Sequence, residues 1–289
     1  MFQSVIDRLR GKKKPRANPI GPECFTVAKR RGAAPEVEDF GGYETRNEST
    51  LRLITDAIGR HGIESFDRIR VNTSDFPATD GKTLSYSTET GNFDLCCPDY
   101  VYDHWRQVAL DDYETTCNRL LAINEPPRTG KLGWRGAETN AVRRTLIDSY
   151  GGSPLFDVEM VQWDRSDPDN LSAPNFLSIE EQARRWRFIL DLEGYGYSAR
   201  LKLLFFAPRA IFLQDRPGKD LCFETIRPWV HYVPVEADLS DLEEKTRYLA
   251  ARPDIEQAII AAAQANARAN LTRDNAINRW AAILMRGSR

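Results

Sequence analysis

Several features that mark particular protein classes are scarce in this sequence of 289 residues. It contains only 3 histidines, and its 5 cysteines show no Cys-x-x-Cys spacing, so a zinc site built from these residues is not expected. An odd number of cysteines without ligand spacing is typical of reduced thiols rather than of a disulfide framework. The sequence therefore argues against small domains stabilised by zinc or by disulfides.

Long apolar runs and an excess of basic residues are absent too. No apolar run reaches the roughly 18 residues that a membrane-spanning helix needs. Lys and Arg number 40 against 42 Asp and Glu, a net charge of −2, which gives no reason to expect a nucleic-acid partner. The N-terminus, MFQSVIDRLRGKKKPR, is too polar for a signal peptide, so we expect a cytoplasmic protein. A peripheral contact of this segment with the inner membrane face is a second possibility, and a short docked helix with a basic tail is the simpler interpretation.

Strand and helix patterns alternate in the second part of the chain. The segment EPPRTG at 125–130 marks a candidate domain boundary. After it, short apolar strands, ending with WVHYVPVE at 229–236, alternate with helical patterns, which predicts a parallel, doubly wound sheet. We expect an α/β fold with two lobes, 1–125 and 126–270, and a cleft outside the carboxyl ends of the strands. The Ala-rich tail is expected to form two helices, of which the helix at 271–289 packs back on the first lobe.

A glycine-rich loop follows one of the predicted strands. In LEGYGYSARLKLL, Gly194, Gly196 and Ala199 match the dinucleotide fingerprint G-x-G-x-x-A. A strand, a glycine loop and a helix point backbone N–H groups at a phosphate, whatever the rest of the ligand is. Two features argue against NAD: earlier βα units of the same lobe precede the loop, and Arg200 and Lys202 add positive charge where the pyrophosphate would lie.

A second basic loop supports the phosphate interpretation. In GWRGAETNAVRR, Arg135 ends a strand, Gly136 permits a turn, and Arg143 and Arg144 follow on a helix. Arginines from two such loops are able to hold a diphosphate bidentately without a metal. The Asp-x-Asp motif at 167–169 lies in a Pro-containing segment and is interpreted as an exposed turn, so no metal site is expected.

Four segments resemble the signature blocks of the family 90 glycosyltransferases, which include Rumi-type protein O-glucosyltransferases and bacterial LpsA-type lipopolysaccharide-modifying enzymes. They are VNTSDFP, WRGAETNAVRR, LEGYGYSARLKLL and RPWVHYVPVEADLSDL. The resemblance implies a GT-B fold, in which two Rossmann-like lobes enclose a cleft. It also implies inverting transfer from a UDP-sugar to a hydroxyl acceptor without a metal or other cofactor. The acceptor implied is a glycan or glycolipid, as in bacterial lipopolysaccharide or another surface glycan.

The resemblance also implies roles for individual residues. Asp75 falls on the family's catalytic Asp, although Ser74 stands where an Arg usually precedes it, and Ala137 stands where Ser is frequent. The nucleotide-sugar-binding residues implied by the two loops are Arg135, Gly136, Ala137, Arg143, Gly194, Tyr195, Gly196, Tyr197, Ser198, Ala199, Arg200 and Lys202.

Three alternatives remain open from the residues. The fingerprint allows an NAD-dependent oxidoreductase, and nucleotide-sugar binding without turnover would suit a regulatory protein. Asp75 is alternatively a turn residue that only caps its own loop.

Overall fold

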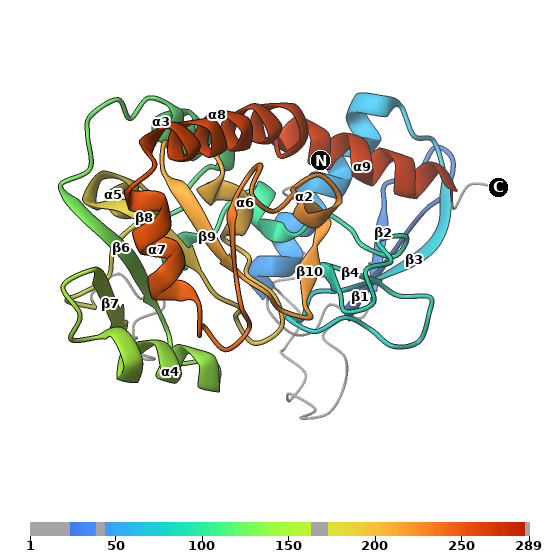
Figure 1. Cartoon of the computed structure of the whole chain (residues 1–289). Coiled ribbons are helices and arrows are strands. Elements are labelled where there is room, and N and C mark those ends of the chain that lie inside the picture. The colour runs from blue at the N-terminus through green and yellow to red at the C-terminus, as the bar shows by residue number, and fades with distance from the viewer. Residues whose placement is uncertain (1–23, 39–43, 163–172, 287–289) are drawn as a thin grey trace. The chain divides into compact units, whose positions relative to one another are not determined.

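The computed structural model of the chain describes residues 24–38, 44–162 and 173–286 (Figure 1). The chain divides into two compact units. The first unit contains residues up to Asp103, together with Gly218–Leu221 and the C-terminal segment from Arg273; the second contains His104–Pro217 and Cys222–Thr272. The division thus follows Asp103, whereas the sequence pattern placed a boundary at 125. The N-terminal basic segment and the Asp-x-Asp motif lie outside the described residues.

A parallel sheet forms the centre of the second unit. Its strand order is β11-β9-β8-β6-β7, and every neighbouring pair is parallel. The α/β class and the parallel sheet predicted from the sequence are therefore confirmed. The strands are β6 (Thr129–Gly136), β7 (Phe156–Met160), β8 (Trp186–Asp191), β9 (Ala210–Gln214) and β11 (Val233–Val235).

Helices of the second unit pack against this sheet, α4 on β7, α5 on β8, α7 on β11 and α8 on β9 (Figure 1). Two of these helices begin directly after a residue whose side chain accepts a hydrogen bond from an otherwise unpaired backbone N–H group. Asn140 caps α4, and Ser178 forms a capping box with Glu181 at α5. The helices are α3 (Tyr113–Leu121), α4 (Ala141–Tyr150), α5 (Ile179–Arg185), α6 (Leu201–Leu204), α7 (Leu242–Ala250) and α8 (Pro253–Asn270).

Apolar side chains from the sheet and its helices form a continuous core in the second unit. Leu132, Phe188 and Phe212, on three adjacent strands, are completely buried, and burial of each such side chain contributes about 1.5–3 kcal/mol. Gly133 makes room for Trp186, because a Cβ at Gly133 would lie 1.7 Å from the indole ring. Close contact between β6 and β8 therefore depends on this glycine.

The first unit contains a smaller mixed sheet with the order β2-β1-β3-β4. β1 pairs antiparallel with β2 and β3, and only β3 and β4 are parallel. β3 begins at Phe66 and ends at Asn72, so Asp75 lies just past its carboxyl end. The strands are β1 (Cys24–Lys29), β2 (Glu36–Glu38), β3 (Phe66–Asn72) and β4 (Leu84–Ser85), with a separate ladder of β5 (Ser87–Thr88) and β10 (Lys219–Asp220).

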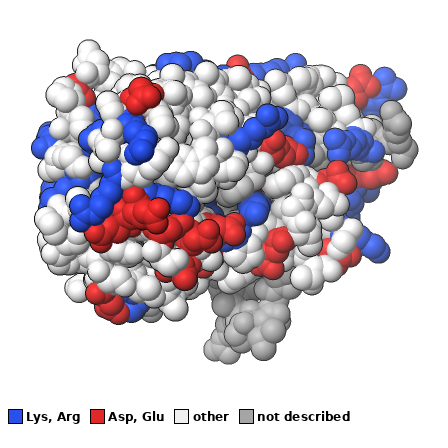
Figure 2. Space-filling view, viewed as in Figure 1, with Lys and Arg blue, Asp and Glu red and all other residues white. Residues whose placement is uncertain are grey.

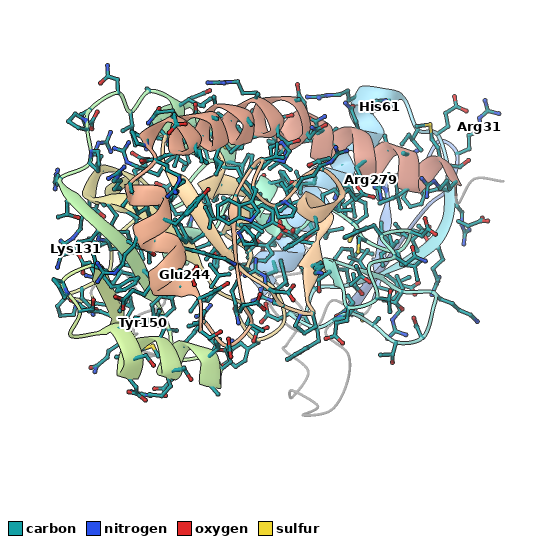
Figure 3. The ribbon with its side chains drawn as sticks, viewed as in Figure 1. Arg31, His61, Lys131, Tyr150, Glu244 and Arg279 are labelled. Carbon is teal, nitrogen blue, oxygen red and sulfur yellow. The ribbon has the colours of Figure 1, made fainter. Side chains whose placement is uncertain are left out.

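Two helices from distant parts of the sequence pack together in the first unit, α2 (Glu44–His61) and α9 (Arg273–Arg286). Figure 3 labels His61 at the end of α2 and Arg279 on α9. His61 Nε2 lies 3.0 Å from Asn278 Oδ1, and Arg279 donates to the Phe93 carbonyl at 3.3 Å. α8 ends at 270 and α9 begins at 273, so the predicted break in the helical tail is confirmed.

Acidic side chains gather on one face of the second unit, over the first turn of α7 and the loop before it (Figure 2). Negative charge at a helix N-terminus interacts favourably with the helix dipole. This face is not expected to bind an anionic ligand. The residues are Glu236, Asp238, Asp241, Glu243 and Glu244.

Among the described residues, none of the helices is long and apolar enough to span a bilayer.

Candidate functional site

The loops after β6 and β8 lie next to each other at one edge of the parallel sheet. The chain runs from β6 outward to β7 and then returns to β8 on the other side of β6. In an open parallel sheet, such a reversal leaves a crevice at the carboxyl ends of the two strands, and ligands bind there. Both basic loops identified in the sequence follow these two strands, so the structure brings them together.

Asn140 and Arg143 connect the two loops. Asn140 Nδ2 donates to the Gly194 carbonyl at 2.7 Å. Arg143 donates from Nε to the Glu193 carbonyl at 2.8 Å and from Nη1 to the Ala137 carbonyl at 2.7 Å. Burial, and then the nearby positive charge of Arg200, lower the pKa of Arg143 to about 10, so the guanidinium stays protonated at neutral pH. Its third nitrogen, Nη2, has no protein hydrogen bond among the described residues.

Gly136 and Gly194 are required by close approaches of neighbouring atoms. A Cβ at Gly136 would lie 2.6 Å from the Trp134 ring and 3.2 Å from Arg143 Nη1. A Cβ at Gly194 would lie 2.6 Å from the Tyr197 carbonyl oxygen, which accepts the Gly194 N–H at 3.1 Å. Any larger residue at either position would displace a loop or the arginine that joins the loops.

The carboxylate of Asp191, at the end of β8, lies beneath these loops and is completely buried. Its Oδ1 accepts from Ser198 Oγ at 2.8 Å and from Arg200 Nε at 3.1 Å, and its Oδ2 accepts from Arg216 Nη2 at 2.8 Å. Burial alone would raise the pKa of Asp191, but Arg216, Arg200 and Ser198 outweigh burial and lower it. An ionised Asp191 balances one positive charge, whereas two guanidinium groups contact it.

Arg200 and Lys202, the cations that the sequence assigned to the phosphate, already bond to the protein. Besides its carboxylate partner, Arg200 donates from Nη1 to the Arg135 carbonyl at 2.9 Å and from Nη2 to the Leu190 carbonyl at 3.0 Å. Lys202 is buried and donates to the Ala199 carbonyl at 2.8 Å. The Arg200 bonds fix the ends of β6 and β8, and the Lys202 bond fixes the end of the glycine loop, so both side chains support the loops.

The side chain of Arg135 lies in a separate ionic cluster. Its Nη2 lies 2.7 Å from Asp157 Oδ1 and 3.3 Å from Glu159 Oε1. Burial raises the pKa of Asp157, but hydrogen bonds from Trp186, Arg135 and Arg185 outweigh burial and lower it to about 2. This geometry favours a structural role for the Arg135 side chain rather than contact with a ligand.

The segment after the glycine loop is shorter than the sequence pattern predicts. The expected helix is a single turn, α6, and one turn provides little of the dipole that a dinucleotide fingerprint uses. Tyr195 is 58% exposed at the tip of the loop. Ligand contacts of this loop would therefore come from its backbone and from Tyr195. The following residues, Gly196, Tyr197, Ser198 and Ala199, are buried.

Asp75 lies in the first unit and pairs with Arg46 of α2, with Nη1 3.2 Å from Oδ1 and Nη2 3.4 Å from Oδ2. The hydrogen bonds that close its turn come from other residues: Asn72 Nδ2 donates to the Phe76 carbonyl at 2.7 Å, and Ser74 Oγ accepts from Phe76 N at 3.2 Å. Asp75 is thus not the side chain that caps this loop. The residue directly before Asp75 is Ser74, which carries no charge, so the guanidinium beside Asp75 comes instead from Arg46 of α2.

Sequence reasoning missed Arg46, Asn140, Asp191 and Arg216. Asp191 and Arg216 carried a usable signal, since each stands at or just after the end of an apolar strand run, in FILD and FLQDR. The carboxyl ends of parallel strands share one edge of a sheet, so polar residues there are expected to meet. Arg46 carried no such signal, because α2 and the loop after β3 are brought together only by tertiary packing.

Among the described residues, no group of three or more His, Cys, Asp or Glu side chains is arranged to hold a metal ion. The arginines and the loop backbone carry N–H donors that suit an anionic ligand.

Comparison with known proteins gives a family match over most of the chain. The model described as Glycosyl transferase family 90 matches residues 64–288. The chain is 27% identical over 264 residues to human Protein O-glucosyltransferase 1, a match that spans 84% of this chain and 66% of that protein. It is 30% identical over 142 residues to O-glucosyltransferase LpsA of Dichelobacter nodosus, which spans 47% of this chain and 42% of the relative. The chain thus covers less than two thirds of the length of these relatives.

A solved structure of a glycosyltransferase from Rickettsia africae ESF-5 aligns with 86% of this chain and 83% of its own, with a TM-score of 0.46 and 10% identity. At this TM-score the likeness supports no further conclusion.

The role of Asp191 can be tested by Asp191→Asn, which removes the charge and leaves the buried Arg216 and the partly buried Arg200 without a counter-ion. We expect the free energy of unfolding to fall by about 3–5 kcal/mol at neutral pH. Since the folded pKa lies below the unfolded value of about 3.9, the contribution of Asp191 is complete above that pH and is lost as the pH falls through the folded pKa. The difference from wild type should therefore narrow in acid.

Urea unfolding at a series of pH values measures this difference. Asp148→Asn, at an exposed position on α4, is the matched control and should change stability little at any pH. An Asp191→Asn protein as stable as the Asp148→Asn protein would contradict the assignment.

Proposed function

The chain belongs to glycosyl transferase family 90, and from this premise we propose that it transfers a sugar from a UDP-sugar to a hydroxyl acceptor with inversion at the anomeric carbon. The observation that carries the proposal is that two basic loops converge at the carboxyl ends of β6 and β8. O-glucosyl transfer, named for the relatives, is the transfer we favour.

In this proposal the second unit binds the donor. The N–H groups of the loop at 195–198 and Arg143 Nη2 bind the diphosphate, while Arg200 and Lys202 hold the loop in position. The exposed ring of Tyr195 offers a surface for the uracil base. As the bond between the anomeric carbon and the β-phosphate oxygen breaks, the fixed positive charge stabilises the departing UDP. A preorganised charge of this kind does not need a divalent metal.

Asp75 is proposed as the general base. It accepts the proton of the acceptor hydroxyl while the hydroxyl oxygen bonds to the anomeric carbon. Its paired contacts with both terminal nitrogens of Arg46 restrict the orientation of the carboxylate. The turn bonds provided by Asn72 and Ser74 leave the Asp75 carboxylate available for this role.

The geometry of the glycine loop favours a nucleotide sugar over NAD. The dinucleotide fingerprint relies on a helix whose N-terminus points at the pyrophosphate. Here the loop leads into the single turn of α6, and the side chains of Arg200 and Lys202 hold the loop instead.

The acceptor and the place of action are proposed from the family resemblance. A glycan or glycolipid of the bacterial surface, such as lipopolysaccharide, suits a hydroxyl acceptor, and synthesis would take place in the cytoplasm. The N-terminal basic segment proposed to touch the inner membrane lies outside the described residues, as does the Asp-x-Asp motif.

Donor binding can be tested by thermal unfolding of the protein with UDP, UDP-glucose or NADH. A ligand at 100 times its dissociation constant should stabilise the protein by about 2.7 kcal/mol. We expect UDP and UDP-glucose to raise the melting temperature and NADH to leave it unchanged. Stabilisation by NADH alone would refute the proposal in favour of an oxidoreductase.

The base can be tested by Asp75→Asn, which keeps the size of the side chain but cannot accept the proton. Transfer should fall by roughly 10²–10⁴-fold, with UDP affinity and melting temperature near wild type. Asp80→Asn is the matched control in the same unit, because Asp80 does cap its own turn, through Thr83 N at 2.8 Å and Thr83 Oγ1 at 2.7 Å. It should lower stability slightly and leave turnover per folded molecule unchanged.

If Asp75→Asn kept full turnover, the base would be another residue. If wild type bound UDP-glucose but neither transferred nor hydrolysed the sugar with any acceptor, the chain would be a binding protein.

Metal independence can be tested with a chelator. Because arginines and backbone N–H groups provide the positive charge, transfer is expected to continue in EDTA at the rate seen without it. The measurement compares the rate of sugar transfer without EDTA, with EDTA, and with EDTA plus an excess of Mn²⁺ or Mg²⁺. Activity that disappears with EDTA and returns with metal would assign a metal role to carboxylates such as those of the Asp-x-Asp motif.

A further inference from the structure

Arg216 is the guanidinium at this edge whose hydrogen bonds are least complete. It follows the end of β9 by two residues, and 1% of its side chain is exposed. Nη2 bonds to Asp191 at 2.8 Å, whereas Nε and Nη1 are buried and have no hydrogen-bond partner among the described residues. A buried donor on a charged group is costly to leave unsatisfied. A ligand atom that accepts hydrogen bonds from Nε and Nη1 would remove this cost.

A second incomplete polar group lies on the loop after β6. Thr139, between β6 and α4, has a buried hydroxyl without a partner among the described residues. The next residue, Asn140, donates to the carbonyls of Glu193 and Gly194. The unsatisfied groups thus belong to the loops after β6 and β9, on the two strands that flank β8.

The charges around Arg216 favour an anion as the missing partner. Arg143, Arg200 and Arg216 lie close enough for both other arginines to affect the pKa of Arg143. The completely buried carboxylate among them is that of Asp191, and Glu193 is partly exposed. Positive charge therefore exceeds buried negative charge at this edge, and an oxyanion would reduce the excess.

We propose that Arg216, with Thr139 and the loop after β8, forms an oxyanion subsite that binds a phosphate or a sugar carboxylate of the donor. This inference rests on the proposed function, since it places the subsite within the nucleotide-sugar site. It assigns contact with the ligand to Arg216, a residue outside the signature loops, and a supporting role to Arg200, whose three nitrogens all bond to the protein.

The subsite opens when a covering side chain moves. The Phe223 ring lies over the guanidinium of Arg216, with its centroid 5.8 Å from Cζ. Phe223 is only partly buried, so rotation of this ring exposes the arginine at a smaller loss of packing than movement of a core residue would need.

The chain offers a matched control at the other end of the same strand. Arg209 immediately precedes β9 and is also buried, but its Nε, Nη1 and Nη2 donate to the carbonyls of Ala183, Pro208 and Glu125 at 2.7, 2.7 and 3.0 Å. All three nitrogens of Arg209 are satisfied, so the same substitution at the two ends of β9 separates loss of a ligand contact from loss of a structural arginine.

Calorimetry with inorganic pyrophosphate, UDP, UDP-glucose and UDP-glucuronate tests the subsite in wild type, Arg216→Gln and Arg209→Gln. If the oxyanion is a phosphate, Arg216→Gln should weaken all four ligands by roughly 10- to 100-fold. If it is a sugar carboxylate, Arg216→Gln should weaken UDP-glucuronate alone. Arg209→Gln should lower the melting temperature more than Arg216→Gln and leave all four affinities unchanged.

Arg216→Lys keeps the charge and serves as the second variant if Arg216→Gln folds poorly. It should retain part of the affinity, because an ammonium cannot hold Asp191 and an oxyanion with the same planar geometry. If wild type binds UDP and both Arg216 variants bind all four ligands as wild type does, the subsite is refuted and the proposed function stands. If wild type binds none of the four, both proposals fail together.

Discussion

The ion pairs of Asp191 with Arg200 and Arg216 hold together the edge of the sheet where the loops converge. A buried carboxylate is unfavourable without partners, and buried guanidinium groups are unfavourable without a counter-charge. The ion pairs therefore offset the free-energy cost of removing each charged group from water. Because Arg200 also bonds to the carbonyls of Arg135 and Leu190, this pairing positions β6 relative to β8. The position of the glycine loop depends on that spacing.

Arginines at this edge differ in how many of their donors the protein uses. Arg200 is bonded at all three nitrogens, Arg143 at two and Arg216 at one. A guanidinium has five N–H groups in a fixed plane, so donors that the fold leaves unused remain directed and available. Counting unused donors separates arginines that build the site from those suited to bind in it, which sequence position alone does not do.

The parallel sheet and its helices were predictable because apolar strand runs alternate with capped helical patterns, as at 129–160. The fold of 24–38 was not, because β1 has a short, weakly patterned sequence and gains stability by pairing with β3, some 40 residues later. WVHYVPVE was expected as a strand from 229, but Trp229 has a φ of 59° and His231 Nδ1 accepts from Arg227 N at 2.9 Å, so a turn precedes the strand Val233–Val235. For the site, glycine spacing identified the loops, whereas the roles of Arg200 and Arg216 depend on hydrogen bonds between distant residues.

The first unit is assembled from separate stretches of sequence: the residues up to Asp103, Gly218–Leu221 and the segment that contains α9. On the ribosome, α2 emerges early, but the helix that packs against it is made after the whole second unit. Until then the side of α2 that packs against α9 in the folded protein lacks this cover. The second unit is thus able to fold while the chain grows, whereas the first unit is completed only after α9 has been made, so the first unit is the part that exposes apolar surface longest during synthesis.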